Sequence, residues 1–326
     1  MKKIIVDAMG GDLGSGAVVE GILLFLSTHD SIEITVVGKK EELTALEGKC
    51  KIIDARSVVP MTAGALDVMR LKDWSMMVAL QAMKDENYDA VVSCGSTGGF
   101  LSAATLLLKT IPGIKRAALM SPFPTHIKGK KAVILDIGAN VENSPEELLQ
   151  FAKMGRLYSQ IVFNVQSPSV YLLNNGTEEH KGNALYRETY KLLKESEFPN
   201  FQGNIEARNA LDGSADVVVA DGFTGNIFLK SSEGIAKFMG QLIKDVFKKN
   251  LWTKIGYLHV RKGMKNLIET MDYKSTGGAM LLGVNGIVVK AHGSSDGYSF
   301  SSALEVANKL IEGDLVNRIK AGILDA

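Results

Sequence analysis

The chain has 326 residues, a net charge of +1, 46% hydrophobic residues and 22% charged residues. This length suits one large globular domain or two closely joined lobes, and the balanced charge gives no reason to expect a nucleic-acid partner. Cys50 and Cys94 show no pairing or metal-ligand spacing, and the histidines are scattered. We therefore expect no metal and a cytoplasmic location, since no apolar stretch is long enough for a signal or a membrane span.

Apolar runs alternate with amphipathic stretches in the first part of the chain. We expect strands at 4–6, 32–37 and 52–53, helices at 18–27, 41–48 and 75–83, and a loop or short helix at 61–67. Such alternation is typical of a mostly parallel, doubly wound sheet between two layers of helices. The expected fold is therefore a three-layer α/β/α unit.

Helix signals are clear in the second part as well. Residues 100–109 are apolar nearly all round, which predicts a buried helix, and Ser144-Pro-Glu-Glu147 is a capping box that starts a helix reaching 158. We also expect a strand at 170–173, a helix at 185–195, a long amphipathic helix at 226–249 and an irregular basic segment at 250–275. The chain reads as one compact unit over 1–326, with two lobes sharing a sheet as the alternative and 227–275 as a peripheral elaboration.

Five apolar runs lead straight into loops of small polar residues. These loops begin at Asp7, Ser93, Asp136, Asp221 and Lys290. Ligands of parallel sheets bind where strands end, so the pattern predicts one large polar site at one rim of the sheet, suited to an oxyanion. Acids at strand ends often cap backbone N–H groups instead, but three of them together favour a site because unpaired buried carboxylates are costly.

Two loops invite opposite interpretations. The glycines at 10–16 follow the first strand, but the G-x-G-x-x-G spacing of dinucleotide sites is absent and no Walker motif occurs. We therefore expect no cofactor. The loop 93–99 opens a helix, so its N–H groups and the hydroxyls of Ser96 and Thr97 predict an anion site, with an ordinary helix cap as the alternative.

Motifs spread over the chain form a joint pattern. They are Asp7-Ala-Met-Gly-Gly-Asp12, Leu135-Asp-Ile-Gly-Ala-Asn140, Gln150-Phe-Ala-Lys-Met-Gly155, Glu178-Glu-His-Lys-Gly-Asn183, Gly203-Asn-Ile-Glu206, the run 216–226, Gly277-Gly-Ala-Met-Leu-Leu-Gly283 and His292-Gly-Ser-Ser295. Nearly end to end, this pattern resembles the PlsX family, the phosphate acyltransferases of bacterial phospholipid synthesis. The chain departs from the family's usual motifs at Ser96, where Asn is usual, at 13–15, where Pro is usual, and at 207–209, where Gly-Arg-Asp is usual.

The resemblance implies a fold like that of the isocitrate and isopropylmalate dehydrogenases, shared with phosphotransacetylase. It also implies conversion of acyl-[acyl carrier protein] and inorganic phosphate to acyl phosphate, which passes to the membrane glycerol-3-phosphate acyltransferase. The family forms homodimers. The alternatives are a dehydrogenase of the same fold and a non-catalytic protein that binds phosphate or an acyl ligand.

Attack of phosphate on a thioester needs an anion cradle, donors for the oxyanion and help for the leaving thiolate. We expect Asp221 or His292 to handle the proton, Asn226 to hold oxygen, and Lys181 and Arg208 to add positive charge. The residues expected to bind phosphate and the thioester are Gly10, Gly11, Asp12, Ser93, Ser96, Thr97, Gly98, Asp136, Asn140, Asn183, Glu206, Gly222, Thr224 and Gly225.

The segment 237–265 is strongly basic. A solvated helix face is the usual fate of such a run, whereas the functional alternative is a docking surface for an acidic acyl carrier protein or for anionic lipid at the inner face of the membrane. The residues expected to form it are Lys244, Lys248, Lys249, Trp252, Lys254, Arg261 and Lys262.

Overall fold

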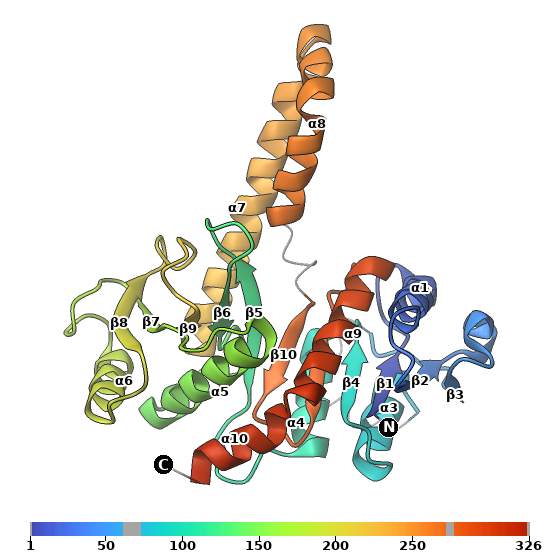
Figure 1. Ribbon diagram of the computed structural model, residues 1–326, viewed down its shortest axis with the longest axis horizontal. Helices are drawn as coiled ribbons and strands as arrows, with labels where there is room; N and C mark the ends of the chain where they lie inside the picture. The colour runs from blue at the N-terminus through green and yellow to red at the C-terminus, as the bar shows by residue number, and fades with distance from the viewer. Residues whose placement is uncertain (1, 61–72, 272–276, 325–326) are drawn as a thin grey trace.

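The computed structural model describes residues 2–60, 73–271 and 277–324, so the segment expected at 61–67 lies outside the described residues. Its centre is one sheet of eleven strands in the order β3-β2-β1-β4-β11-β10-β5-β6-β9-β7-β8 (Figure 1). The strands are β1 (Lys2–Asp7), β2 (Ile32–Gly38), β3 (Lys51–Asp54), β4 (Ala90–Ser93), β5 (Ala118–Pro124), β6 (Lys131–Leu135), β7 (Val170–Asn174), β8 (Phe201–Glu206), β9 (Val217–Val219), β10 (Ala279–Leu282) and β11 (Ile287–Lys290).

Helices cover both faces of this sheet, and two short 3-10 turns, Lys40–Glu42 and Thr44–Leu46, stand where a helix was expected at 41–48. The helices are α1 (Gly14–Leu26), α3 (Ser75–Asp85), α4 (Thr97–Leu108), α5 (Pro145–Phe163), α6 (Ala184–Glu195), α7 (Gly222–Lys248), α8 (Leu251–Met271), α9 (Gly297–Glu312) and α10 (Leu315–Leu324). The three-layer α/β/α prediction is confirmed.

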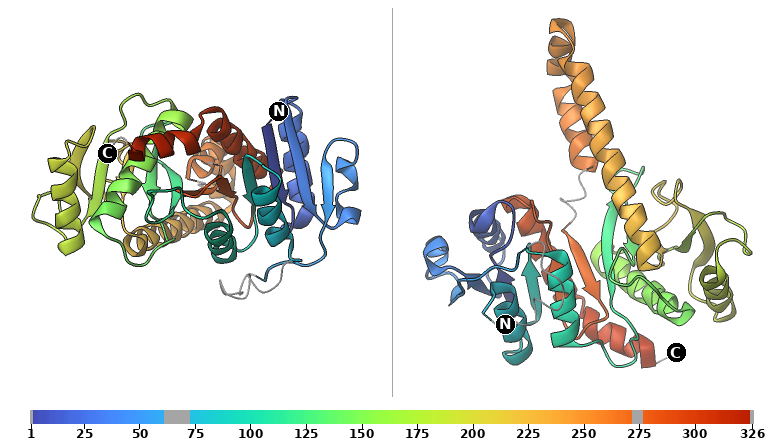
Figure 2. Two further views of the ribbon diagram at one scale, coloured as in Figure 1. Left: turned by 90° about the horizontal axis from the view of Figure 1, so that it is seen from below. Right: turned by 180° about the vertical axis from the view of Figure 1, so that it is seen from behind.

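Except for the edge strand β3, each strand buries side chains on both faces. In β1, Ile4 and Val6 point into the core beneath α1, α5, α6, α9 and α10, whereas Ile5 points into the core beneath α3, α4 and the first turns of α7. Figure 2 shows the red α9 and α10 on one side of the sheet and the helices α4 and α7 on the other. The continuous apolar runs in the sequence follow from this double burial.

Two sets of parallel strands run in opposite directions. β3, β2, β1, β4 and β11 form one set, and β6, β9, β7 and β8 form the other. Between them, β10 and β5 are antiparallel to both of their neighbours. The register places Val92, Val289, Met280, Met120 and Leu135 in one row across the sheet. The carboxyl ends of the two sets therefore approach this row from opposite sides, and the expectation of a single rim is wrong.

The helices α7 and α8 form a hairpin that projects from the body of the protein (Figure 1). The long helix expected at 226–249 is confirmed, but the expectation of an irregular segment after it is wrong, because Leu251–Met271 is helical. At the turn, the side chain of Asn250 accepts from the Thr253 amide (2.9 Å) and the Thr253 hydroxyl accepts from the Asn250 amide (3.1 Å). This reciprocal capping starts the second helix.

Candidate active site

A cavity of about 400 Å³ lies on the α4 and α7 face of the sheet, along the row where the two strand sets meet. Its polar and glycine lining comes from both halves of the sheet and comprises Asp12, Thr97, Gly98, Ser121, Gly138, Asn226, Lys230, Glu233, Gly278, Lys290, His292 and Gly293. Its apolar lining comprises Leu101, Leu119, Ile137, Leu229, Ala279 and Ala291. One cavity thus combines a polar end with an apolar wall.

The loops after β1, β4 and β11 are joined to one another at the polar end. The Asp12 amide donates to the Gly293 carbonyl at 2.7 Å, and the Ser93 hydroxyl donates to the Asp7 carboxylate at 2.7 Å. Asp7 is 1% exposed, and this burial raises the pKa of its carboxyl. Asp7 and Ser93 therefore hold the loops in place, whereas Asp12 lines the cavity.

The first turn of α4 points into the cavity. Ser96 caps this helix, since its hydroxyl accepts from the Gly99 amide at 3.4 Å, and it is only 4% exposed. Thr97 and Gly98 follow it in the first turn, where backbone N–H groups have no carbonyl acceptor within the helix. A Cβ built on Gly98 would meet no atom within 4 Å, so open space lies beside it. The start of α4 is therefore placed to hold an anion.

Lys290 is the last residue of β11 and lies beside this helix start. From the sequence we named it only as the start of a loop and did not expect it among the site residues. The residue is 5% exposed, lines the cavity and donates from its ammonium group to the Ala291 carbonyl. Burial lowers the pKa of Lys290 to about 8, although the nearby Cys94, Asp7 and Asp12 oppose that shift. The signal available in the sequence was a charged residue placed directly after three apolar strand residues.

The opposite wall of the cavity depends on Asp136, which is fully buried at the end of β6. Its carboxylate accepts five hydrogen bonds of 2.8–3.0 Å, from the amides of Leu119, Gly138, Ala139 and Asn140 and from the Asn140 side chain. Burial raises the pKa of Asp136 in spite of these donors. Because all five bonds stay within the protein, Asp136 shapes the loop whose residues Ile137 and Gly138 line the cavity.

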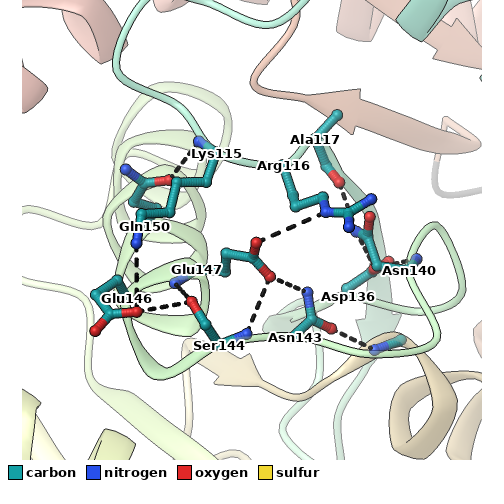
Figure 3. A network of polar contacts seen from close by, with 11 residues as sticks. Lys115, Arg116, Ala117, Asp136, Asn140, Asn143, Ser144, Glu146, Glu147 and Gln150 are labelled. Carbon is teal, nitrogen blue, oxygen red and sulfur yellow. Dashed lines mark hydrogen bonds and ion pairs between the residues drawn. The ribbon is translucent and has the colours of Figure 1, made fainter.

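A polar network anchors this loop to the start of α5 (Figure 3). The Asn140 side chain donates to the Ala117 carbonyl at 2.7 Å, and the Asn143 side chain donates to Glu147 at 3.0 Å. Glu147 also belongs to the predicted capping box with Ser144, which the structure confirms. The oxygen of Asn143 accepts from the first amide of α7 at 3.4 Å, so the network also reaches the start of that helix.

The first turn of α7 packs directly on the Asp136 loop. A Cβ on Gly222 would collide with the Asn140 carbonyl, and one on Gly225 would collide with the Asp136 carbonyl. Asp221 caps this helix by accepting from the Thr224 amide (2.9 Å) and hydroxyl (2.7 Å).

Asp221 also accepts from the Tyr186 hydroxyl at 2.7 Å. Its carboxylate is therefore engaged in the capping structure, and it does not line the cavity. Asn226 does line it, and a Cβ on Gly138 would lie 3.3 Å from the Asn226 side-chain carbon. The close approach of helix and loop thus brings Asn226 to the cavity.

Of the residues expected at the site, the cavity is lined by Asp12, Thr97, Gly98, Asn226 and His292. A second group surrounds it without lining it: Gly10, Gly11, Ser93, Ser96, Asp136, Asn140, Asp221, Gly222, Thr224 and Gly225. The roles assigned to both groups stay predictions.

The remaining four expected residues lie at or after the ends of β7 and β8, on the outer edge of the sheet. They are Lys181, Asn183, Glu206 and Arg208. Lys181 pairs with Glu178 at 3.9 Å, Arg208 pairs with Glu206 at 2.6 Å, and Asn183 caps α6. None of the four lines the cavity, so the structure does not bring them together with the other expected residues. Within residues 2–60, 73–271 and 277–324, no cluster of three metal-binding side chains occurs.

The fold of the protein is one that a phosphotransacetylase shares. The EutD phosphotransacetylase from Staphylococcus aureus superposes with a TM-score of 0.58 over 95% of this chain and 94% of that one. At 17% sequence identity, the likeness concerns the fold alone.

The family follows from the sequence comparisons. A family model described as "Fatty acid synthesis protein" matches residues 2–318, and the chain belongs to this family. Phosphate acyltransferases from Clostridium perfringens strain SM101 and Clostridium botulinum strain Alaska E43 are each 43% identical to it over 329 residues. The alignments cover 98% of this chain and 96% and 98% of those proteins. The protein is thus an acyltransferase enzyme that uses phosphate, which confirms the resemblance and sets aside a dehydrogenase or a non-catalytic binder.

Proposed function

We propose that the enzyme transfers the acyl group of an acyl-[acyl carrier protein] to inorganic phosphate and releases acyl phosphate and the free carrier for phospholipid synthesis. One observation carries this proposal: a single cavity joins a polar end, where the helix α4 begins, to an apolar wall. Thr97 and Gly98 of α4 stand beside Lys290 at the polar end, and Leu101 and Leu229 lie along the wall. Phosphate and an acyl chain require this combination.

The chemistry follows from that arrangement. Phosphate held at the start of α4 attacks the thioester carbonyl, a carbon–oxygen bond forms, and the carbonyl oxygen becomes an oxyanion. Asn226, on the opposite wall, is placed to donate to that oxygen. The carbon–sulfur bond then breaks and releases the thiolate. Of the two residues expected to handle the proton, His292 lines the cavity, whereas Asp221 is engaged with Tyr186 and Thr224.

The test is direct. Purified protein is incubated with palmitoyl-[acyl carrier protein] and phosphate, and acyl phosphate is trapped with hydroxylamine. We expect acyl hydroxamate to form only when protein and phosphate are both present, with no added nucleotide. Thioester loss at full rate without phosphate, or an absolute requirement for NAD, would rule out the proposal.

We further propose that the α7–α8 hairpin docks the acidic carrier protein. All seven residues expected to form the docking surface are exposed there, and Trp252 is 81% exposed at the start of α8. Cations beside exposed apolar side chains suit an acidic partner with an acyl group, and basic patches steer such partners. In the described residues no helix is long and apolar enough to cross a membrane.

The hairpin also exposes an apolar stripe, which includes Ile235 (63% exposed), Phe238 (61%) and Val246 (58%). Contiguous apolar surface of this kind marks an interaction site. We propose that a second copy of the chain covers part of this stripe in a homodimer. Peripheral contact of the hairpin tip with anionic lipid would then bring the product to the membrane glycerol-3-phosphate acyltransferase.

Charge reversal tests the docking surface. Replacing Lys248, Lys249 and Lys254 with Glu should weaken use of the carrier-bound substrate, most at low salt, and should affect acyl-coenzyme A less. The matched control reverses three exposed lysines elsewhere, at positions 49, 84 and 128. Equal loss with both substrates, or an equal loss in the control, would leave the hairpin as a solvated surface.

A further inference from the structure

Lys290 is the most deeply buried charged side chain among the residues that line the cavity. It is 5% exposed and belongs to the end of β11, in the half of the sheet that also supplies the start of α4. The charged and titratable groups near it are Asp7 from β1, Asp12 from the loop after β1, Cys94 from the loop after β4, and His292 two residues further on.

The other buried groups of this cluster are already engaged or unreactive. Asp7 accepts from the Ser93 hydroxyl and from the Met9 amide at 3.2 Å. Burial raises the pKa of the Cys94 thiol to about 11, so this thiol stays protonated near neutral pH. Compared with Asp7 and Cys94, the ammonium group of Lys290 is the group that can release a proton into the cavity. Its only hydrogen bond in the described structure is to the Ala291 carbonyl.

We propose that Lys290 is a catalytic residue that protonates the leaving thiolate during acyl transfer. This assignment rests on the proposed function. It explains why a lysine stands at a position where burial disfavours its charge, since a residue needed only for packing would be apolar there.

The step is balanced. A phosphate oxygen forms the bond to the carbonyl carbon, and the tetrahedral intermediate collapses with cleavage of the carbon–sulfur bond. The electron pair of that bond stays on sulfur, which takes a proton from the Lys290 ammonium and leaves as a thiol. Acyl phosphate is a stronger acid than inorganic phosphate because the acyl group withdraws electrons. The proton that came in with phosphate therefore restores the ammonium, directly or through His292.

The acidity of Lys290 suits this task. Burial lowers its pKa to about 8, whereas an ordinary lysine has a pKa of about 10.4 and a cysteine-type thiol one of about 8.5. Proton transfer is most effective when the donor and the acceptor are closely matched and the donor titrates near the working pH. A lysine held by burial beside Asp7 and Asp12 meets both conditions.

The experiment compares two leaving groups in one protein preparation. One substrate is the alkyl thioester palmitoyl-[acyl carrier protein], whose thiolate needs a proton to leave. The other is an aryl thioester of palmitic acid, whose thiolate leaves readily without one. We expect Lys290→Met to slow phosphate-dependent cleavage of the alkyl thioester by roughly a hundredfold or more. The aryl thioester should lose much less. The ratio of the two rates does not depend on the folded fraction, so a poorly folding variant still gives an answer.

Two further variants sharpen the result. Lys290→Arg keeps the positive charge but cannot release a proton, so it should show the same dependence on the leaving group. Lys230, which also lines the cavity and pairs with Glu233 at 2.9 Å, provides the matched control. Any loss caused by Lys230→Met should be equal for the two thioesters.

The outcomes separate cleanly. Selective loss with the alkyl thioester in both Lys290 variants supports the assignment. Equal loss with both thioesters, no loss, or full activity in Lys290→Arg overturns it and leaves the proposed function standing. A wild-type protein that cleaves neither thioester in the presence of phosphate overturns the proposed function and this assignment with it.

Discussion

Asp136→Asn should destabilise the protein strongly, although the two side chains have nearly the same shape. The carboxylate accepts three amide donors at one oxygen, from Leu119, Gly138 and Ala139, and two donors at the other, both from Asn140. In the variant one oxygen becomes an amide group, which is itself a donor. The less costly orientation places that group opposite Asn140, so two partly buried donors lose their acceptor.

The magnitude follows from those two donors. A buried donor left without an acceptor costs about 1–3 kcal/mol, and these two donors are partly buried, so the variant should lose roughly 2–4 kcal/mol of unfolding free energy. Since native proteins are stable by about 5–15 kcal/mol, this is a large fraction of the total. Activity should fall as well, because the loop carries Ile137 and Gly138 into the cavity.

Urea unfolding of wild type and variant at neutral pH measures this loss. Asp212→Asn is the matched control, because that carboxylate accepts from the Ser214 amide at 2.8 Å on the exposed surface. The control should lose less than about 1 kcal/mol, since water replaces the exposed contact. If Asp136→Asn loses no more than the control, the carboxylate does not hold the loop in the way its five contacts suggest.

Three further predictions concern the start of α7 and Lys290. Gly225→Ala should destabilise the protein by a few kcal/mol, because its Cβ collides with the Asp136 carbonyl; a melting temperature equal to that of wild type would contradict this close approach. Asp221→Ala should lower both stability and turnover because it removes a helix cap bonded to Tyr186. Asn226→Ala should lower turnover alone. Unfolding and hydroxamate assays on both variants distinguish the two roles. Burial lowers the pKa of Lys290 from 10.5 to about 8. Between these two pH values Lys290 keeps its proton in the unfolded chain and has released it in the folded chain. The unfolding free energy of wild type should therefore rise by roughly 3 kcal/mol relative to that of Lys290→Met as the pH rises through that window. Parallel pH profiles of unfolding free energy for the two proteins would refute this prediction.

Much of the fold could be predicted because its strands are buried on both faces. Runs such as Ile4-Ile5-Val6 feed two cores at once, so they are apolar without interruption and stand out in the sequence. The capping box at Ser144 depends on local spacing alone and was equally visible. Features fixed by short-range chemistry were therefore accessible without a structure.

The central antiparallel strands were not accessible in this way. β5 contains Pro122 and Pro124, which argue against a strand in the middle of a sheet. In the described residues, β5 pairs with β10 only from Ala118 to Met120. Both prolines therefore lie where β5 pairs with β6 alone. Because these strands were missed, the reversal of direction across the sheet was missed, and the loops were assigned to one rim.

The second helix of the hairpin was hidden for a different reason. Gly256 and Gly263 lie inside α8, and glycine inside a helix costs about 1 kcal/mol relative to alanine. Contacts with α7 support the helix, including a ring contact between Phe247 and Tyr257 with centroids 5.3 Å apart. Such packing between distant residues overrides local preference and leaves no short-range signal.

The cavity shows why the acids attracted attention and the lysine did not. Asp136 and Asp221 follow strands and precede glycines, a pattern that fits a catalytic acid and a structural cap equally well. Only three-dimensional contacts distinguish the two, and here the donors of the protein itself occupy both carboxylates. Lys290 looks in the sequence like a strand end that reaches solvent, yet it is 5% exposed, lies near Asp7, Asp12 and Cys94 and lines the cavity. A buried charge that touches the site is therefore the stronger sign of chemistry than an acid whose bonding capacity is already filled.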